Sequence, residues 1–138
     1  MDVYVDSDVV ISSLLSRTGA AYHLLNYSTI TLIISSISLT EIKKVISRRG
    51  MEQKQFEQLI QKRLKIVTIK QGVSTLKVKY LSYVLDVNDA HIVAGAKAAN
   101  VDFLLTYNLK HYKTTKLKAD FNIHVLTPAL FLQYLRGK

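Results

Sequence analysis

The sequence predicts an α/β fold with a mostly parallel central sheet. Short runs rich in β-branched residues alternate along the chain with stretches of helical periodicity, and strands joined through helices form right-handed crossovers that leave the strands parallel. The chain has 138 residues, of which 49% are hydrophobic and 21% are charged. This length and composition are typical of one globular unit with its own core, so we expect a single domain spanning residues 1–138.

The chain begins with strand and helix in alternation. The run DVYV (2–5) has the β-branched composition of a short strand, and SDVVISSLLS (7–16) follows it as a helix. AAYHLLNYS (20–28) is expected to form a second helix, because its apolar residues recur at helical spacing. The apolar run TITLIIS (29–35) is then the second strand.

Two amphipathic helices follow the second strand. In residues 38–49, and again in residues 52–64, apolar side chains recur at the spacing that places them on one face of a helix. The residues on these faces are Leu39, Ile42, Val45 and Ile46 in the first helix and Phe56, Leu59 and Ile60 in the second.

The second half of the chain repeats the alternation. KIVTIK, DFLLTY and NIHVLT are rich in β-branched or apolar residues, and they predict strands at 65–70, 102–107 and 122–127. Further helices are expected at 73–85, from about residue 87, and at 128–136, where Pro128 suits a first helical turn.

The composition also restricts the class of protein. The formal net charge is +9 at pH 7, so the chain either attracts a polyanion such as nucleic acid or carries a solvated, lysine-rich surface. The absence of cysteine excludes a disulfide framework and thiolate metal sites. The chain opens directly with a strand, and no apolar run is long enough to span a bilayer. We therefore expect a soluble cytoplasmic protein with no membrane contact.

Acidic and amide side chains recur where a predicted strand ends or a predicted helix begins. They are Asp6, Glu41, Asp86, Asp89 and Asn108. In a parallel sheet these positions gather at the carboxyl edge, which is where open α/β folds bind their ligands. The sequence therefore predicts a polar site at this edge.

Each of these positions has an alternative explanation as a helix cap. Ser38 and Glu41 fit a capping box, and Asp86 and Asp89 fit N-terminal positions that the helix dipole favours. Several carboxylates at one edge, however, raise one another's pKa unless a cation neutralises them. Oxygen ligands, with no cysteine and no paired histidines, suit Mg²⁺ or Mn²⁺.

Three segments of the chain carry a resemblance to a known family. VYVDSDVVISSLL, SLTEI and DAHIVAGAKAANVDFLLTYN occur in the order and at the spacing of the motifs of PIN-domain ribonucleases, which include the VapC-like toxins of VapBC toxin–antitoxin pairs. The resemblance covers nearly the whole chain. It implies a three-layer α/β/α fold, Mg²⁺- or Mn²⁺-dependent endoribonuclease activity on single-stranded RNA, an antitoxin partner and a homodimer.

The same resemblance implies which residues form the site. The implied catalytic residues are Asp6, Glu41, Asp89, Thr106 and Asn108, of which the first three are the implied metal ligands. Asn108 stands at the family's fourth acidic position. Members that keep this asparagine often carry an aspartate a few residues later, and this chain has His111 in that region. Without a fourth carboxylate, the implied site carries less negative charge than a fully acidic one, which argues against a second metal ion.

We expect hydrolysis by metal-activated water, with Asp8 in a position to orient that water. The basic segment NLKHYKTTKLK (108–118) is expected either to bind RNA or to form a solvated loop. In the first case its lysines neutralise phosphates, and Tyr112 and the neighbouring Tyr107 stack on bases. The residues expected to bind RNA are Lys110, Tyr112, Lys113 and Lys116. His23, His91 and His124 lack ligand spacing and are interpreted as structural or surface residues.

Two other classes of protein remain open at this point. The first is a PIN-like scaffold that binds RNA or a protein partner without cleaving, and the neutral Asn108 keeps it open. The second is a phosphoacceptor receiver domain, which is also an α/β fold with acids at its strand ends. That class requires an aspartate after the third strand, where this chain has Lys70 and Gln71.

Overall fold

A computed structural model describes residues 1–27 and 29–138. This part of the chain forms a five-stranded sheet in the order β3-β2-β1-β4-β5, and every neighbouring pair of strands is parallel. The strands are β1 (Asp2–Val5), β2 (Thr31–Ser35), β3 (Leu64–Val67), β4 (Phe103–Leu105) and β5 (His124–Leu126). The predicted parallel sheet is confirmed, although each strand is shorter than or equal to the segment expected for it.

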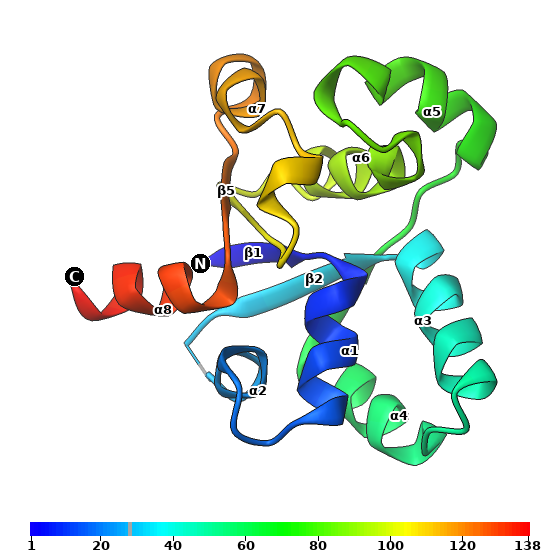
Figure 1. Cartoon of the computed structure of the whole chain (residues 1–138), viewed down its shortest axis with the longest axis vertical. Helices are drawn as coiled ribbons and strands as arrows, with labels where there is room; N and C mark the ends of the chain where they lie inside the picture. The colour runs from blue at the N-terminus through cyan, green and yellow to red at the C-terminus, as the bar shows by residue number, and fades with distance from the viewer. Residues whose placement is uncertain (28) are drawn as a thin grey trace.

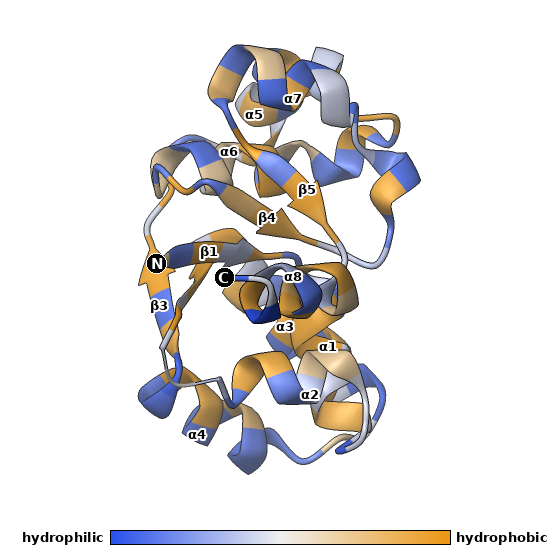
Figure 2. Cartoon of the chain, turned by 90° about the vertical axis from the view of Figure 1, so that its left-hand side faces the viewer, coloured by the Kyte–Doolittle hydropathy of each residue, from blue (hydrophilic) through white to orange (hydrophobic). Residues whose placement is uncertain are grey.

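Helices cover both faces of the sheet, which gives the three-layer α/β/α arrangement (Figures 1 and 2). One layer contains α1 (Ser7–Leu15), α2 (Ala20–Leu25), α3 (Ser36–Arg48), α4 (Gln53–Lys62) and α8 (Pro128–Arg136). The other contains α5 (Val73–Tyr80), α6 (Ala90–Ala98) and α7 (Thr114–Phe121). Short 3-10 turns lie at η1 (Leu81–Tyr83), η2 (Val87–Asp89) and η3 (Leu109–His111).

The central strands are apolar on both faces because both faces are covered. In β1, Val3 and Val5 belong to the core beneath α1 and α3, whereas Tyr4 belongs to the core beneath α6. Figure 2 shows these apolar strands between the two helical layers. Tyr4 also requires glycine at position 95 of α6, because a Cβ atom at Gly95 would overlap the tyrosine ring.

Several element boundaries differ from the prediction. Helix α7 begins at Thr114, within the basic segment 108–118 that was expected to be a loop or an RNA-binding segment, and continues to Phe121. The helix predicted at 20–28 ends at Leu25, and its predicted last residue, 28, lies outside the described residues. Across the described part of the chain, no helix has the length and apolar character needed to cross a membrane.

The start of α3 also differs from the prediction. Ser35, and not Ser38, is the N-cap, and its side-chain oxygen accepts a hydrogen bond of 3.0 Å from the backbone N–H of Ser38. The capping box proposed for Ser38 and Glu41 is therefore wrong, because the helix begins at Ser36. Glu41 lies beyond the first turn, which leaves its side chain without a capping role.

Candidate functional site

The site lies where β1 and β4 end side by side at the carboxyl edge of the sheet. Val5 pairs with Leu105 in the ladder, and the backbone N–H of Asp6 donates to the carbonyl of Leu105 at 2.9 Å. Asp6 and Thr106 are therefore held next to each other by the sheet itself. The short stretches that follow these strands supply Asp8 in α1 and Asn108 before η3.

Asp6 is almost completely buried, with 8% of its surface exposed. Two hydroxyl groups donate to its Oδ2 atom, that of Tyr112 at 2.7 Å and that of Thr106 at 3.0 Å. Burial raises the pKa of Asp6, and these two hydrogen bonds offset only part of that effect. Burial, followed by the charge of Asp6, also raises the pKa of Tyr112, so its phenol stays protonated and remains a donor.

Asp8 is held by the segment that follows β4. Its Oδ2 atom accepts from the backbone N–H of Tyr107 at 3.1 Å and from Nδ2 of Asn108 at 3.0 Å. Its Oδ1 atom is buried and has no hydrogen-bond partner among the described residues. Burial, and then the charge of Asp6, raise the pKa of Asp8 to about 7. Asn108, predicted as a site residue, is thus a direct partner of Asp8.

Asp89 is the third carboxylate at this edge, at the junction of η2 and α6. Burial, and then the charges of Asp6 and Asp86, raise the pKa of Asp89 to about 6. Its Oδ2 atom lies 3.2 Å from Nδ1 of His111 without hydrogen-bond alignment, and no other described group donates to it. The capping role is confirmed for Asp86, whose Oδ1 accepts from the N–H of Asn88, but no such bond forms at Asp89 within the described chain. We call Asp6, Asp8 and Asp89 the acidic site.

Glu41 approaches this edge from α3 and has a partner that the sequence analysis did not identify. Its half-exposed side chain places Oε1 2.8 Å from Nε2 of His91 in α6. His91 is buried, with 5% of its surface exposed, and its Nδ1 atom has no partner in the described part of the structure. The interpretation of His91 as a structural or surface residue therefore missed its contact with a candidate site residue. The sequence AHIVAGA (90–96), in which His91 is the only polar residue, is the signal that could have placed it inside.

The donor set of the acidic site fits a hard divalent cation. Buried carboxylate oxygens of Asp8 and Asp89 have no hydrogen-bond partner among the described residues, and the charge of Asp6 raises the pKa of both groups. A cation would satisfy the oxygens and remove the repulsion. Within residues 1–27 and 29–138, however, no three acidic or histidine side chains already lie in a metal-binding cluster. Glu41 pairs with His91 instead.

The residues that were expected to bind RNA lie in different environments in the structure. Lys110 and Lys113 are exposed beside the acidic site. Tyr112 is buried, with 4% of its surface exposed, and cannot stack on a base because its ring packs in the core and its hydroxyl binds Asp6. Lys116 lies over the ring of Tyr83, with its Nζ atom 4.5 Å from the ring centre.

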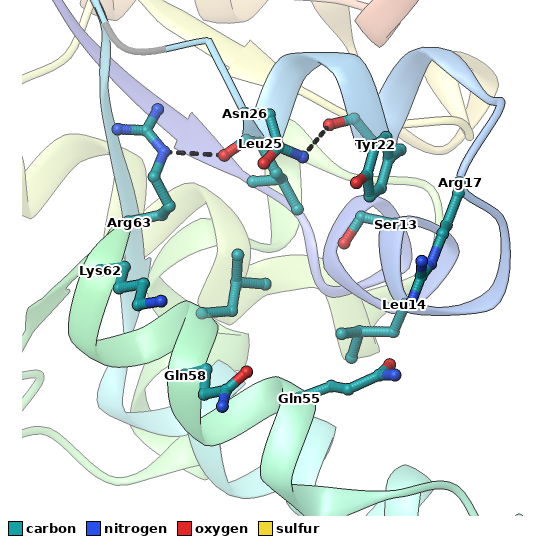
Figure 3. Close-up of a pocket in the computed structure, with 11 residues that line it drawn as sticks. Ser13, Leu14, Arg17, Tyr22, Leu25, Asn26, Gln55, Gln58, Lys62 and Arg63 are labelled. Atoms are coloured by element: carbon teal, nitrogen blue, oxygen red, sulfur yellow. Dashed lines mark hydrogen bonds between the residues drawn. The ribbon is translucent and has the colours of Figure 1, made fainter.

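A separate cavity of about 370 Å³ lies between α1, α2 and α4, away from the acidic site (Figure 3). Arg17, Lys62 and Arg63 line it, and no described carboxylate does. Arg63 is fixed there by a hydrogen bond of 2.7 Å from its Nε atom to the carbonyl of Leu25. Without an acid in its lining, this cavity cannot hold the metal chemistry that the acidic site suits.

Residues 2–110 match the family model described as PIN domain. No curated protein matches the sequence. The fold is similar to that of a toxin–antitoxin complex from Klebsiella pneumoniae, with a TM-score of 0.66 and 24% identity over 91% of this chain and 97% of that chain. It is also similar to VapBC2 from Rickettsia felis bound to a DNA fragment from their promoter, with a TM-score of 0.61 and 20% identity over 91% of this chain and 97% of that chain. At these identities the likeness shows a shared fold.

Proposed function

Because the chain belongs to the PIN-domain family, we propose that it is a toxin-type endoribonuclease that uses Mg²⁺ or Mn²⁺ to hydrolyse phosphodiester bonds of single-stranded RNA. The observation that carries this proposal is the acidic site. Asp6, Asp8 and Asp89 lie at one edge of the sheet, the pKa of each is raised, and two of their buried oxygens accept no hydrogen bond from the described residues. Such an arrangement is stable only with protons or a cation.

In this proposal Asp6 and Asp89 hold the cation, and Glu41 contributes to the outer side of the same site. A bound Mg²⁺ or Mn²⁺ would supply Lewis-acid activation of water and neutralise charge at the scissile phosphate. Thr106 and Tyr112 both donate to Oδ2 of Asp6 and so fix the orientation of that carboxylate.

Asp8 would act on the attacking water. Burial and the charge of Asp6 raise the pKa of Asp8 to about 7 in the metal-free chain. A bound cation would lower this pKa, so Asp8 would face the water as a carboxylate that can accept a hydrogen bond or a proton. Asn108 and the N–H of Tyr107 occupy its Oδ2 atom, so Oδ1 is the atom that would receive the proton. Thr106 and Asn108 carry no charge that would repel the phosphate.

We further propose that residues 1–138 act as one domain in the cytoplasm, as a homodimer controlled by an antitoxin. The fold's likeness to two toxin–antitoxin complexes supports the antitoxin partner. The net charge of +9 supports RNA as the substrate, with Lys110 and Lys113 as exposed cations beside the acidic site.

Cleavage of labelled single-stranded RNA tests the proposal. The purified protein should cleave in Mn²⁺ or Mg²⁺ and stop in excess EDTA. Asp89→Asn should abolish cleavage and leave the metal-free fold as stable as before or more so, because it removes one of three repelling carboxylates. Asp102→Asn, at an exposed position outside the site, is the matched control and should cleave normally. Cleavage that persists in EDTA, or in Asp89→Asn, would contradict the proposal.

A scaffold that binds RNA or a protein without cleaving is the second candidate. It is favoured by the neutral Asn108 and by the pairing of Glu41 with His91, which leaves no cluster of three ligands in the described chain. RNA binding without cleavage, at saturating Mn²⁺, would support this alternative.

A further inference from the structure

A second cleft adjoins the acidic site at the η2 turn, where Asn88 lines it next to Asp89 in the sequence. It has a volume of about 550 Å³ and lies between α3 and α5. Figure 1 shows these two helices beyond the carboxyl edge of the sheet. Its walls include Glu41 of α3 and His91 of α6, the two residues that pair beside the acidic site. The volume is within the range of about 300–1,000 Å³ that is usual for ligand sites.

Local hydrogen bonds build the wall of this cleft. The backbone N–H of Ile69, in the segment after β3, donates to Oγ of Ser36 at 3.1 Å. Thr40, one turn further along α3, donates to the carbonyl of Ser36 at 3.2 Å. Ser36 and Thr40 both line the cleft, so its α3 wall is fixed in place by the loop that leaves the sheet.

Two lysines face this cleft, Lys44 from α3 and Lys77 from α5. Neither forms an ion pair with any residue that the structure describes. Lys97 and Lys116, by contrast, each lie 4.5 Å from the centre of an aromatic ring, and Lys79 lies 5.5 Å from the ring centre of Tyr80. Lys44 and Lys77 are therefore free to bind an anion, and we call this space the lysine cleft.

The remaining lining suits a nucleotide. Ile37 and Val73 supply apolar surface, and Asn88 supplies an amide that can bind a base edge. His91 contributes a buried ring whose Nδ1 atom has no partner in the described chain. Asn88 is followed directly by Asp89, so the cleft and the acidic site share the η2 turn.

We infer that the lysine cleft binds the nucleotide of a single-stranded RNA that is next to the scissile phosphate. Lys44 and Lys77 bind its backbone phosphates, and its base enters the cleft between Ile37 and Val73. The RNA strand then crosses η2 and reaches Lys110 on the other side of the acidic site. This inference rests on the proposed ribonuclease function, because it places the same substrate.

Binding of a fluorescein-labelled single-stranded RNA, measured by anisotropy in EDTA over a series of salt concentrations, tests the inference without requiring cleavage. The double variant Lys44→Ala/Lys77→Ala should raise Kd about fivefold to tenfold and reduce the salt slope by about 1.4, which is about 0.7 for each lost phosphate contact. The matched control is Lys43→Ala/Lys79→Ala, which removes the same charge from the same two helices outside the cleft. It should change Kd less than about twofold. Because Lys79 lies 5.5 Å from the ring centre of Tyr80, thermal unfolding of this variant is measured alongside to show that it is folded.

A second variant tests whether the space in the cleft contributes to RNA binding in addition to its charge. Val73 is 43% exposed on the cleft wall, so Val73→Trp should fill the space, weaken RNA binding and leave the salt slope unchanged. Equal losses in the two lysine pairs would overturn the inference, as would full binding by Val73→Trp or no RNA binding by the unaltered protein. Failure of the proposed function is a different result, namely RNA binding without cleavage in Mn²⁺.

Discussion

The metal-free protein should lose stability as the pH rises from 5 to 8, with Asp8 as a main cause. Burial and the charge of Asp6 raise the pKa of Asp8 from 3.8 to about 7 in the folded chain. The folded state therefore binds the proton more tightly than the unfolded state. The resulting penalty is absent below the unfolded pKa, grows as the pH rises toward the folded pKa, and is complete above it.

The size of this effect follows from the two pKa values. Integrating the proton linkage for Asp8 alone, between pH 5 and pH 8, gives a loss of about 2–3 kcal/mol in the free energy of unfolding. The pKa values of Asp6 and Asp89 are raised as well, so both carboxylates act in the same direction. With a urea m-value of about 1–3 kcal/mol/M, the loss from Asp8 alone should lower the midpoint of unfolding by about 0.7–3 M.

Urea unfolding followed by circular dichroism in EDTA at pH 5, 6.5 and 8 measures this loss. Asp8→Asn removes the titrating group and keeps an oxygen that can accept from Tyr107 and Asn108. The variant should match the unaltered protein at pH 5 and exceed it at pH 8. Asp102→Asn is the control and should follow the unaltered protein. Saturating Mn²⁺ should restore stability at pH 8. A profile that is flat or rises toward pH 8, or the same pH dependence in Asp8→Asn, would refute the reasoning.

Two further variants test the partners of the acidic site. Tyr112→Phe removes the hydroxyl that donates to Asp6 at 2.7 Å, and it should lower the free energy of unfolding by about 1–3 kcal/mol at pH 8, where Asp6 carries the greater charge, and by less at pH 5. Asn108→Asp places a carboxylate where Nδ2 now donates to Asp8 at 3.0 Å, and it should destabilise the metal-free protein at pH 8 but tighten Mn²⁺ binding in a calorimetric titration.

These two variants also have clear contrary outcomes. An unchanged unfolding midpoint for Tyr112→Phe at pH 8 would mean that its hydroxyl does not stabilise the charge of Asp6. Unchanged Mn²⁺ affinity with slower RNA cleavage in Asn108→Asp would mean that Asn108 contacts the substrate phosphate and is not part of the cation site.

Local sequence patterns predicted the position of the site better than its internal contacts. Asp6 and Asn108 were placed at the carboxyl edge because strand ends and helix starts leave short-range signals. The bond between Tyr112 and Asp6 joins residues 106 positions apart, and no local pattern encodes such a pair. The exposed-looking sequence around Tyr112 instead suggested a base-stacking residue, although the fold buries its ring.

The boundaries that were missed have local causes. The segment SSISLTE offers three serines as possible caps, and only the end of β2 decides that Ser35 is the one used. Helix α7 was not predicted because its sequence is dominated by lysine and threonine, and Leu117 is the residue that anchors it in the core. The contact between His91 and Glu41 was not predicted because Glu41 comes from a helix in the opposite layer.

The central position of β1 determines when the acidic site can assemble during synthesis of the chain. Asp6 is translated well before its hydrogen-bond partners Thr106 and Tyr112, which follow 100 and 106 positions later. β1 cannot pair with β4 until most of the chain has been translated. A nascent chain that ends before Thr106 therefore carries no assembled acidic site, and under the proposed ribonuclease function it would not cleave the RNA around it.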